Sequence, residues 1–263
     1  MFLIESSSDL AGGNIELIAE KITIPTELPR LSRSRLLAQL EKSLTSCTST
    51  IISGRAGTGK TALARDFARS CGRQVAWYKV DAPEGDLNSF FQYLIASIRK
   101  ERPHFGGKTS MTLIENANDD QISMLADAFV YELVEGEGKP LLIVIEDLHL
   151  VCDSEWLVPF FRRLLPLLPS EVHMLITSRT MPPAPMWRMR SKQTLSVIAE
   201  ENLAFTRQEA IELFESYELS SEHASIALDH THGRAASLAR FAAALTETKQ
   251  SVFRTGLPAN SNI

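Results

Sequence analysis

Short apolar runs alternate with amphipathic stretches through the middle of the chain. Five apolar runs predict β-strands, over residues 49–53, 74–80, 141–146, 172–177 and 194–198. Between them, apolar residues recur at helical spacing and predict helices, near residues 60–71, 87–99, 120–134 and 155–167. Strands that alternate with helices are typical of an α/β fold in which helices cover both faces of a mostly parallel sheet.

The run Leu141–Ile145 is aliphatic at every position. Such a run is typical of a strand that is buried on both faces, so we expect it in the interior of the sheet. A helix needs ~20 apolar residues to cross a bilayer, and this run is far shorter. The sequence therefore predicts no membrane span.

The pattern changes to helix alone after Ile198. Thr206 and Glu209 have the spacing of a capping box, which predicts the start of a helix. Further helical segments follow near residues 222–228 and 235–245. These segments predict a small helical domain over residues 200–248.

The two ends of the chain are polar and rich in serine, glycine or asparagine. We expect a flexible, loosely held arm over residues 1–24 and a frayed tail over residues 249–263. A helix over residues 33–44 leads into the first strand, because leucines recur there at helical spacing. The main α/β domain is therefore expected over residues 25–199.

Composition and charge narrow the class of protein. The chain has 263 residues, of which 44% are hydrophobic and 22% charged, so it can bury a core and is not wholly disordered. Its formal net charge of −5 argues against non-specific binding of nucleic acid. The 3 cysteines are too far apart for a metal site and odd in number for a disulfide framework. A cytoplasmic protein is expected, since the first residues also lack the pattern of a secretory signal.

The strongest chemical signal is the sequence Gly54-Arg55-Ala56-Gly57-Thr58-Gly59-Lys60-Thr61, which follows a predicted strand and opens a predicted helix. It matches the P-loop pattern G-x-x-x-x-G-K-[ST]. Backbone N–H groups of such a loop point at phosphate oxygens, and the helix N-terminus adds partial positive charge. Lys60 adds a full charge for the β- and γ-phosphates, and the Thr61 hydroxyl can ligate Mg²⁺. The predicted nucleotide contacts run from Gly54 to Ala62, and the alternative is a glycine-rich turn with a solvated lysine.

An acidic pair follows the apolar strand over residues 141–145. Active sites of open α/β sheets lie at the carboxyl ends of strands, which is where Glu146 and Asp147 stand. We expect Glu146 to contact Mg²⁺, directly or through water, and Asp147 to polarise the attacking water. Glu146 occupies a position that is more commonly Asp. The alternative is a pair of carboxylates that end the strand and face solvent.

Arg179 stands at the end of the next apolar strand. A guanidinium there can bond two oxygens of a γ-phosphate, so Arg179 is a candidate sensor of that phosphate. The alternative is a surface salt bridge, which contributes little to stability. We interpret His149 as a packed or exposed loop residue and not as a ligand.

Further segments accompany the P-loop in a fixed order. They are Arg33-Ser34-Arg35-Leu36-Leu37-Ala38-Gln39-Leu40, Trp77-Tyr78 with Asp81, Phe91-Gln92-Tyr93-Leu94-Ile95-Ala96, Ile145-Glu146-Asp147-Leu148-His149-Leu150, Ser178-Arg179 and Leu203-Ala204-Phe205-Thr206-Arg207-Gln208-Glu209-Ala210. Over about residues 20–245 this set resembles the nucleotide-binding domain of the STAND class of signal-transduction ATPases. Within that class it is most similar to LuxR-type, MalT-like transcriptional regulators.

The resemblance implies a five-stranded P-loop NTPase core of the AAA-like, ASCE type, followed by a small helical lid. It places Arg33 where the family has an arginine on the adenine side of the nucleotide. It also implies a switch in which ADP holds an inactive state, ATP with an inducer allows assembly, and hydrolysis resets the cycle.

Two features depart from the family pattern. The family's lid commonly carries a Gly-x-Pro or Gly-Trp element before its last helix, where this chain has Gly233-Arg234-Ala235-Ala236. Relatives also continue into winged-helix, superhelical sensor and DNA-binding segments. We therefore expect either a fragment of a longer regulator or a shortened member that works through partners.

Three functions are compatible with a P-loop. The expected one is a regulatory switch that binds Mg-ATP or ADP and associates with itself or with a protein partner. The alternatives are a scaffold that binds nucleotide without hydrolysing it, and a small-molecule kinase. Residues 200–229 carry Arg207 as their only Lys or Arg, against eight carboxylates: Glu200, Glu201, Glu209, Glu212, Glu215, Glu218, Glu222 and Asp229. This acidic lid disfavours a kinase and direct DNA binding, because both need basic residues there.

Overall fold

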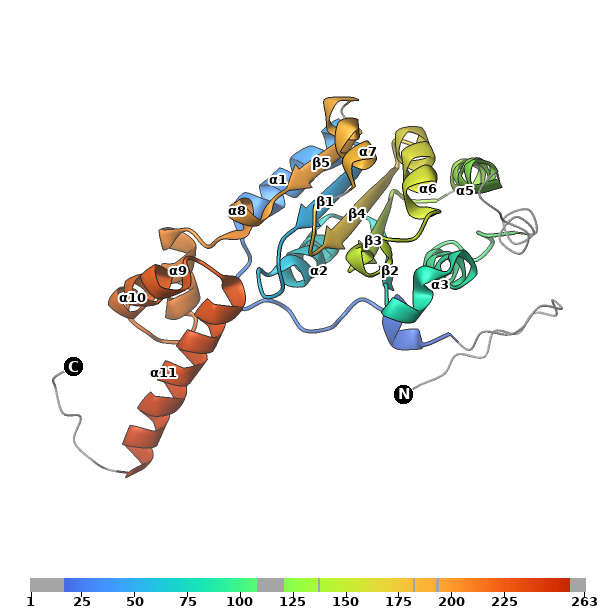
Figure 1. Ribbon diagram of the computed structural model, residues 1–263. Helices are drawn as coiled ribbons and strands as arrows, with labels where there is room; N and C mark the ends of the chain where they lie inside the picture. The colour runs from blue at the N-terminus through green and yellow to red at the C-terminus, as the bar shows by residue number, and fades with distance from the viewer. Residues whose placement is uncertain (1–16, 108–120, 137, 182, 193, 256–263) are drawn as a thin grey trace.

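A parallel β-sheet forms the centre of the computed structural model, which describes residues 17–107, 121–136, 138–181, 183–192 and 194–255 (Figure 1). Its strands are β1 (Ser49–Ser53), β2 (Gln74–Lys79), β3 (Leu141–Glu146), β4 (Val172–Ser178) and β5 (Leu195–Ile198). They lie in the order β2-β3-β4-β1-β5, and every neighbouring pair is parallel. The predicted α/β fold and each of its five strands are confirmed.

Alternate residues of β3 enter two different cores. Leu141, Ile143 and Ile145 pack with α3 (Leu87–Arg99), α5 (Ile122–Glu135) and α6 (Leu157–Leu164) on one face of the sheet. Leu142 and Val144 pack with α1 (Ser34–Ser46) and α2 (Lys60–Ser70) on the other face. Because side chains alternate along a strand, a run that is apolar at every position can serve both cores. β3 is an interior strand, as predicted.

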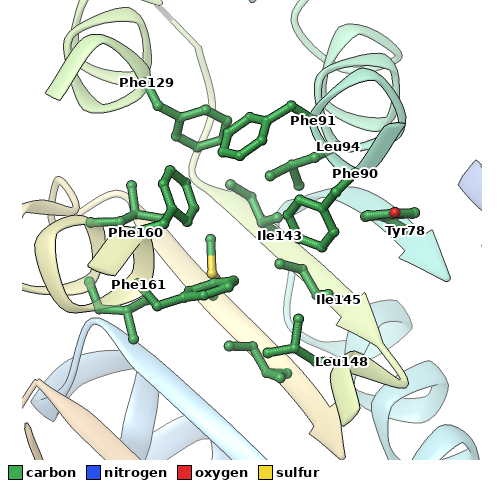
Figure 2. Close-up of a cluster of buried hydrophobic side chains, with 14 of the residues drawn as sticks. Tyr78, Phe90, Phe91, Leu94, Phe129, Ile143, Ile145, Leu148, Phe160 and Phe161 are labelled. Carbon is green, nitrogen blue, oxygen red and sulfur yellow. The ribbon is translucent and has the colours of Figure 1, made fainter. Parts of the chain in front are cut away.

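The core on the α3 face is rich in aromatic rings (Figure 2). Phe91 of α3 and Phe129 of α5 both meet Phe160 of α6 edge to face, with ring centroids 4.7 and 6.2 Å apart. Tyr78 of β2 joins them through Phe90, at 5.2 Å. Aromatic pairs of this geometry contribute ~0.5–1.5 kcal/mol beyond the area they bury. They fix three helices to one face of the sheet and hold its carboxyl edge in place.

The helical domain has a core of its own. It contains α8 (Glu200–Leu203), α9 (Arg207–Glu215), α10 (Ser221–Thr231) and α11 (Ala235–Thr255), and its buried residues include Leu213, Phe214 and Leu238. The predicted capping box is present, since Glu209 N–H donates to the Thr206 hydroxyl and Thr206 N–H donates to the Glu209 carboxylate. α11 extends well past its predicted end at residue 245. Residues 249–255 are therefore helical and not a frayed tail, and residues 256–263 lie outside the described part.

The expected loose arm is wrong for residues 17–24. These residues include a 3-10 helix, η1 (Ala19–Ile22), and Ile22 is 5% exposed. Ile18 N–H donates to the Tyr93 hydroxyl at 3.3 Å, and Lys100 Nζ donates to the Ile22 carbonyl at 2.7 Å. Aliphatic residues scattered through a polar stretch of the sequence thus pack against α3 and β2. Residues 1–16 lie outside the described part.

The remaining elements are short connections. They are η2 (Ala82–Gly85), η4 (Leu148–Val151), η5 (Leu165–Leu167), α7 (Ala184–Trp187) and η6 (Arg188–Lys192). The helix predicted over residues 155–167 is split between α6 and η5, because Pro166 cannot supply the N–H that would continue the α-helix. Within the described residues, we find no helix whose length and apolar character would let it span a membrane.

A buried histidine joins β4 to β1 and to the end of α1. His173 is 2% exposed. Its Nδ1 lies 3.2 Å from the Cys47 carbonyl, which can only accept, so Nδ1 carries the proton. Its Nε2 lies 3.0 Å from the Thr50 hydroxyl and accepts from it. Burial, together with the nearby Arg73 charge, lowers the pKa of His173 to about 4.

We predict that this histidine makes folding sensitive to acid. The unfolded ring, with its ordinary pKa of 6.5, binds a proton that the folded ring with a pKa of about 4 does not bind. The stability that the folded protein gains by keeping this ring neutral is fully present above pH 6.5 and is lost as the pH falls toward 4. Between pH 7.5 and 5 the free energy of unfolding should fall by about 2 kcal/mol more in the wild type than in His173→Gln. Urea titrations at both pH values measure the difference, and equal pH dependence of the two proteins would contradict it.

Candidate functional site

The glycine-rich loop connects β1 to α2 and depends on left-handed backbone. Gly57 and Gly59 have φ angles of 80° and 90°, which side-chain-bearing residues rarely adopt. A Cβ atom at Gly59 would also lie 3.0 Å from Arg33 Nη2 and 3.2 Å from Ala235 Cβ. Conformation and space therefore both require glycine at this position, as the P-loop motif predicted.

Lys60 begins α2 and is 7% exposed. Its Nζ donates to the carbonyl oxygens of Gly54, at 2.6 Å, and Arg55, at 3.1 Å. Burial lowers the pKa of Lys60, while the nearby Asp147 carboxylate opposes that shift. A partly desolvated ammonium held by two carbonyl groups is well suited to exchange them for anionic oxygens.

The two predicted magnesium ligands meet at the end of β3. The Thr61 hydroxyl, in the first turn of α2, donates to Glu146 Oε1 at 2.5 Å. Glu146 is 4% exposed. A hydroxyl and a carboxylate side by side offer the oxygen ligands that Mg²⁺ prefers, so these residues fit the ion. Elsewhere in the described residues, no group of three or more His, Cys, Asp or Glu side chains could hold a metal ion.

Asp147 leaves the strand in a left-handed conformation, with φ 60°. Asp and Asn are among the few side-chain-bearing residues that tolerate this region. Its N–H donates to the Thr177 hydroxyl of β4 at 3.1 Å, which ties together the carboxyl ends of two neighbouring strands. Asp147 and Arg179 both line a cavity beside the glycine loop.

This cavity has a volume of about 470 Å³ and runs from the glycine loop to the helical domain. The predicted residues that line it are Arg33, Ala56, Gly57, Gly59, Lys60, Thr61, Ala62, Asp147 and Arg179. Four others do not line it: Gly54, Arg55, Thr58 and Glu146. Gly54 and Thr58 hold the loop from within, Glu146 lies behind Thr61, and Arg55 turns outward to Glu200.

The far end of the cavity is mainly apolar and was not predicted. Leu31 precedes α1, and Phe205, Leu213 and Tyr217 come from the helical domain. The Arg30 guanidinium lies 4.2 Å from the centre of the Tyr217 ring and helps to join the two walls. An apolar end next to a cluster of phosphate-binding groups fits a nucleotide, with its base at the apolar end. No motif marks these residues, because they come together only through tertiary packing.

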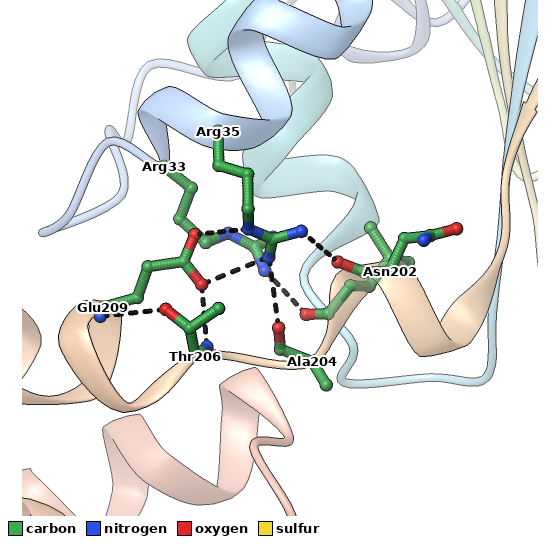
Figure 3. Close-up of polar contacts among 7 residues, drawn as sticks. Arg33, Arg35, Asn202, Ala204, Thr206 and Glu209 are labelled. Carbon is green, nitrogen blue, oxygen red and sulfur yellow. Dashed lines mark hydrogen bonds and ion pairs between the residues drawn. The ribbon is translucent and has the colours of Figure 1, made fainter.

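Arg33 and Arg35 connect the start of α1 to the backbone of residues 202–204, near the start of the helical domain (Figure 3). Arg33 is 5% exposed, and its Nη1 donates to the Leu203 carbonyl at 2.7 Å. Arg35 pairs with Glu209 at 3.2 Å and also donates to the Ala204 carbonyl. Burial lowers the pKa of Arg33 to about 10, so it remains charged at neutral pH. The predicted Arg33 thus lines the cavity and also binds the Leu203 carbonyl near the start of the helical domain.

The first turn of α11 lies directly on the glycine loop. Arg234 Nη2 donates to the Ala56 carbonyl at 2.5 Å, and Ala236 N–H donates to the Gly57 carbonyl at 2.9 Å. On the other side of the loop, Glu200 accepts from the Arg55 N–H at 2.8 Å. The helical domain therefore touches the loop at consecutive residues. In the sequence, residues 233–236 stand out only as a departure from the family pattern, and no motif there predicts a role for Arg234.

Comparison with known proteins places this site in a family. The sequence profile of the AAA ATPase domain matches residues 31–179. The HTH-type transcriptional regulator MalT of Yersinia enterocolitica is 29% identical over 226 residues, covering 84% of this chain and 24% of the regulator. MalT of Yersinia pestis is 31% identical over 202 residues, covering 76% and 22%. The chain thus spans about a quarter of the length of these curated relatives.

A solved structure shows the same fold. It is a Signal Transduction ATPase with Numerous Domains (STAND) protein with a tetratricopeptide repeat sensor, from Pyrococcus horikoshii. It superposes with a TM-score of 0.54 at 19% identity, covering 82% of this chain and 30% of that one.

We predict that Arg234 holds the helical domain against the loop. Arg234→Ala removes one hydrogen bond between them, so the neighbouring Ala236 N–H should exchange with solvent roughly fivefold faster. Hydrogen–deuterium exchange of the nucleotide-free protein measures this rate. Arg240→Ala, an exposed change on the same helix, is the control and should leave the rate unchanged. Equal exchange in Arg234→Ala and the wild type would show that this contact does not hold the domain.

Proposed function

The chain belongs to the AAA ATPase domain family, and on that premise we propose that it is the nucleotide-binding switch module of a MalT-like STAND regulator. It binds Mg-ATP, hydrolyses it slowly, and uses the difference between ATP and ADP to control assembly with itself or with a protein partner. One observation carries the proposal: a single cavity joins the glycine loop, Asp147 and Arg179 to the helical domain.

Binding follows from the groups at each end of the cavity. The loop amides and Lys60 bind the phosphates, and Lys60 exchanges its contacts with the Gly54 and Arg55 carbonyls for phosphate oxygens. Thr61 and Glu146 hold Mg²⁺, which reduces the charge repulsion among the phosphates when it is bound. The base lies at the apolar end, between Leu31 and Tyr217, and Arg33 lies beside it.

Hydrolysis relies on the two residues at the strand ends. Asp147 accepts a hydrogen bond from the attacking water and orients it, and Arg179 binds the oxygens of the γ-phosphate. Their backbones stand on adjacent strands, β3 and β4, whose ends are joined by the bond from Asp147 to Thr177. This arrangement supports a fixed distance between water and phosphate.

The helical domain supplies the output of the switch. It contacts the loop through Arg234 and Ala236 and also walls the cavity. A change in the phosphates therefore acts directly on the position of α11. The acidic character of this domain argues against direct DNA binding by the chain and favours a protein partner.

We predict that Lys60→Ala weakens ATP binding. The ammonium makes charge-assisted hydrogen bonds to phosphate, so its loss should raise the Kd for Mg-ATP roughly 10- to 100-fold. Isothermal titration calorimetry measures the Kd. Lys42→Ala, an exposed change on α1 outside the cavity, is the control. Unchanged affinity in Lys60→Ala would overturn the phosphate site.

We predict that Asp147→Asn slows hydrolysis and spares binding. Asparagine tolerates the left-handed backbone at this position but lacks the negative charge that polarises the attacking water. Phosphate release should fall about 100-fold while the Kd for ATP stays within a factor of about two. Equal turnover in the two proteins would remove the catalytic assignment. Intact ATP after long incubation of the wild type with Mg²⁺ would instead favour a scaffold that does not hydrolyse its nucleotide.

A further inference from the structure

His149 lies two residues beyond the proposed catalytic carboxylate, in the short helix η4. Its side chain is 11% exposed, and both ring nitrogens are buried without a hydrogen-bond partner. Buried polar atoms are nearly always paired, so a ring with two unpaired nitrogens calls for an explanation. The sequence position of His149 predicts a packed or exposed loop residue. A packing role alone does not explain why both ring nitrogens are buried without a hydrogen-bond partner.

The nearest charged group to this ring is Asp147. The His149 Nδ1 atom lies 3.8 Å from Asp147 Oδ1, which is about 1 Å longer than a hydrogen bond. Burial lowers the pKa of His149, Asp147 opposes that shift, and the charges of Arg179 and Lys60 add to it, so the neutral imidazole is favoured. A neutral imidazole carries one N–H, which can be donated to a carboxylate.

The backbone of His149 is fixed on both sides. Leu148 and Val151 are 3% and 2% exposed and anchor η4 in the core. Leu150 N–H donates to the Asp147 carbonyl at 3.0 Å, which closes the turn around the ring. Because the backbone of η4 is anchored, we expect the shorter, partly exposed Asp147 side chain to be the group that moves to meet the imidazole.

We propose that His149 is a positioning residue for Asp147. This inference rests on the proposed function: when Mg-ATP is bound, His149 Nδ1–H donates to one carboxylate oxygen and leaves the other oxygen for the attacking water. A carboxylate held at one oxygen has one orientation in place of several, so the water that it binds is aligned before reaction. Because His149 does not line the cavity, it acts through Asp147 and not on the nucleotide.

The opposing explanation is that His149 only fills space beneath the site. Leucine has a comparable size and no polar atoms, so a side chain that only fills space can be leucine without loss. Asparagine is smaller, but its Nδ2 atom stands close to the place of the imidazole Nδ1–H. The pair His149→Leu and His149→Asn therefore separates shape from hydrogen bonding.

Steady-state ATPase assays and ATP binding on both variants provide the test. His149→Leu should lower kcat about tenfold with the Kd for Mg-ATP within about twofold, and His149→Asn should restore kcat to within about threefold of the wild type. His104→Leu, at an exposed histidine remote from the cavity, is the control and should match the wild type. Melting temperatures exclude unfolding as the cause of any loss.

Two results for turnover in this assay overturn the proposal. One is wild-type turnover in His149→Leu, which would show that the ring does not position Asp147. The other is equal loss in the leucine and asparagine variants, which would show a purely structural role. A parallel fall in ATP affinity would count in the same way, because it would place His149 in binding and not in positioning.

A second measurement works even if the wild type hydrolyses no ATP. Imidazole ¹⁵N spectra with Mg²⁺ and the non-hydrolysable analogue AMPPNP should show a protonated His149 Nδ1 whose signal shifts when the analogue binds. The shift should be absent in Asp147→Gly, which tolerates the left-handed backbone and has no acceptor oxygen. No turnover together with this shift would refute hydrolysis and leave the pairing standing. No shift in a protein that binds the analogue would refute the pairing alone.

Discussion

The close approach of α11 to the glycine loop is the constraint on which the site depends. Gly57 turns with φ 80°, and a Cβ atom there would lie 3.0 Å from Ala236 Cβ. Because the loop has no side chain at this point, Ala236 N–H can reach the Gly57 carbonyl. The same left-handed turns shape the loop that lines one end of the cavity. One backbone requirement thus serves both the shape of the loop and the close packing of α11 upon it.

The acidic end of the site depends on the sheet. Ile145 of β3 stands in register with Ile176 of β4, and both are buried in the aromatic-rich core. Because the strands are parallel, their carboxyl ends emerge together, and Glu146 and Asp147 follow the one strand as Arg179 follows the other. Packing far from the cavity therefore sets which side chains enter it. The large hydrophobic core contributes to function through this alignment.

Sequence patterns identify the residues at the loop end of the cavity, and they do not identify those at its apolar end. Lys60, Thr61 and Asp147 occupy fixed positions relative to a motif or a strand end, so short-range patterns identify them. Leu31 and Tyr217 are far apart in sequence and meet only when the helical domain folds back. Arg234 bonds a backbone carbonyl, and no side-chain pattern marks such a partner. The arm was mispredicted for a similar reason, since η1 packs on β2 and α3, which come much later in the chain, and Ile22 is buried there.

The arrangement of lid contacts determines what a change at the phosphates can do. On the base side, Arg30 lies on Tyr217 and Arg35 pairs with Glu209, and both arginines precede or begin α1. On the phosphate side, Arg234 bonds the loop itself. The two sets of contacts involve different residues, so loss of the loop contact alone leaves those of Arg30 and Arg35 in place. The helical domain therefore has contacts that can change at the loop while others hold it to the start of α1.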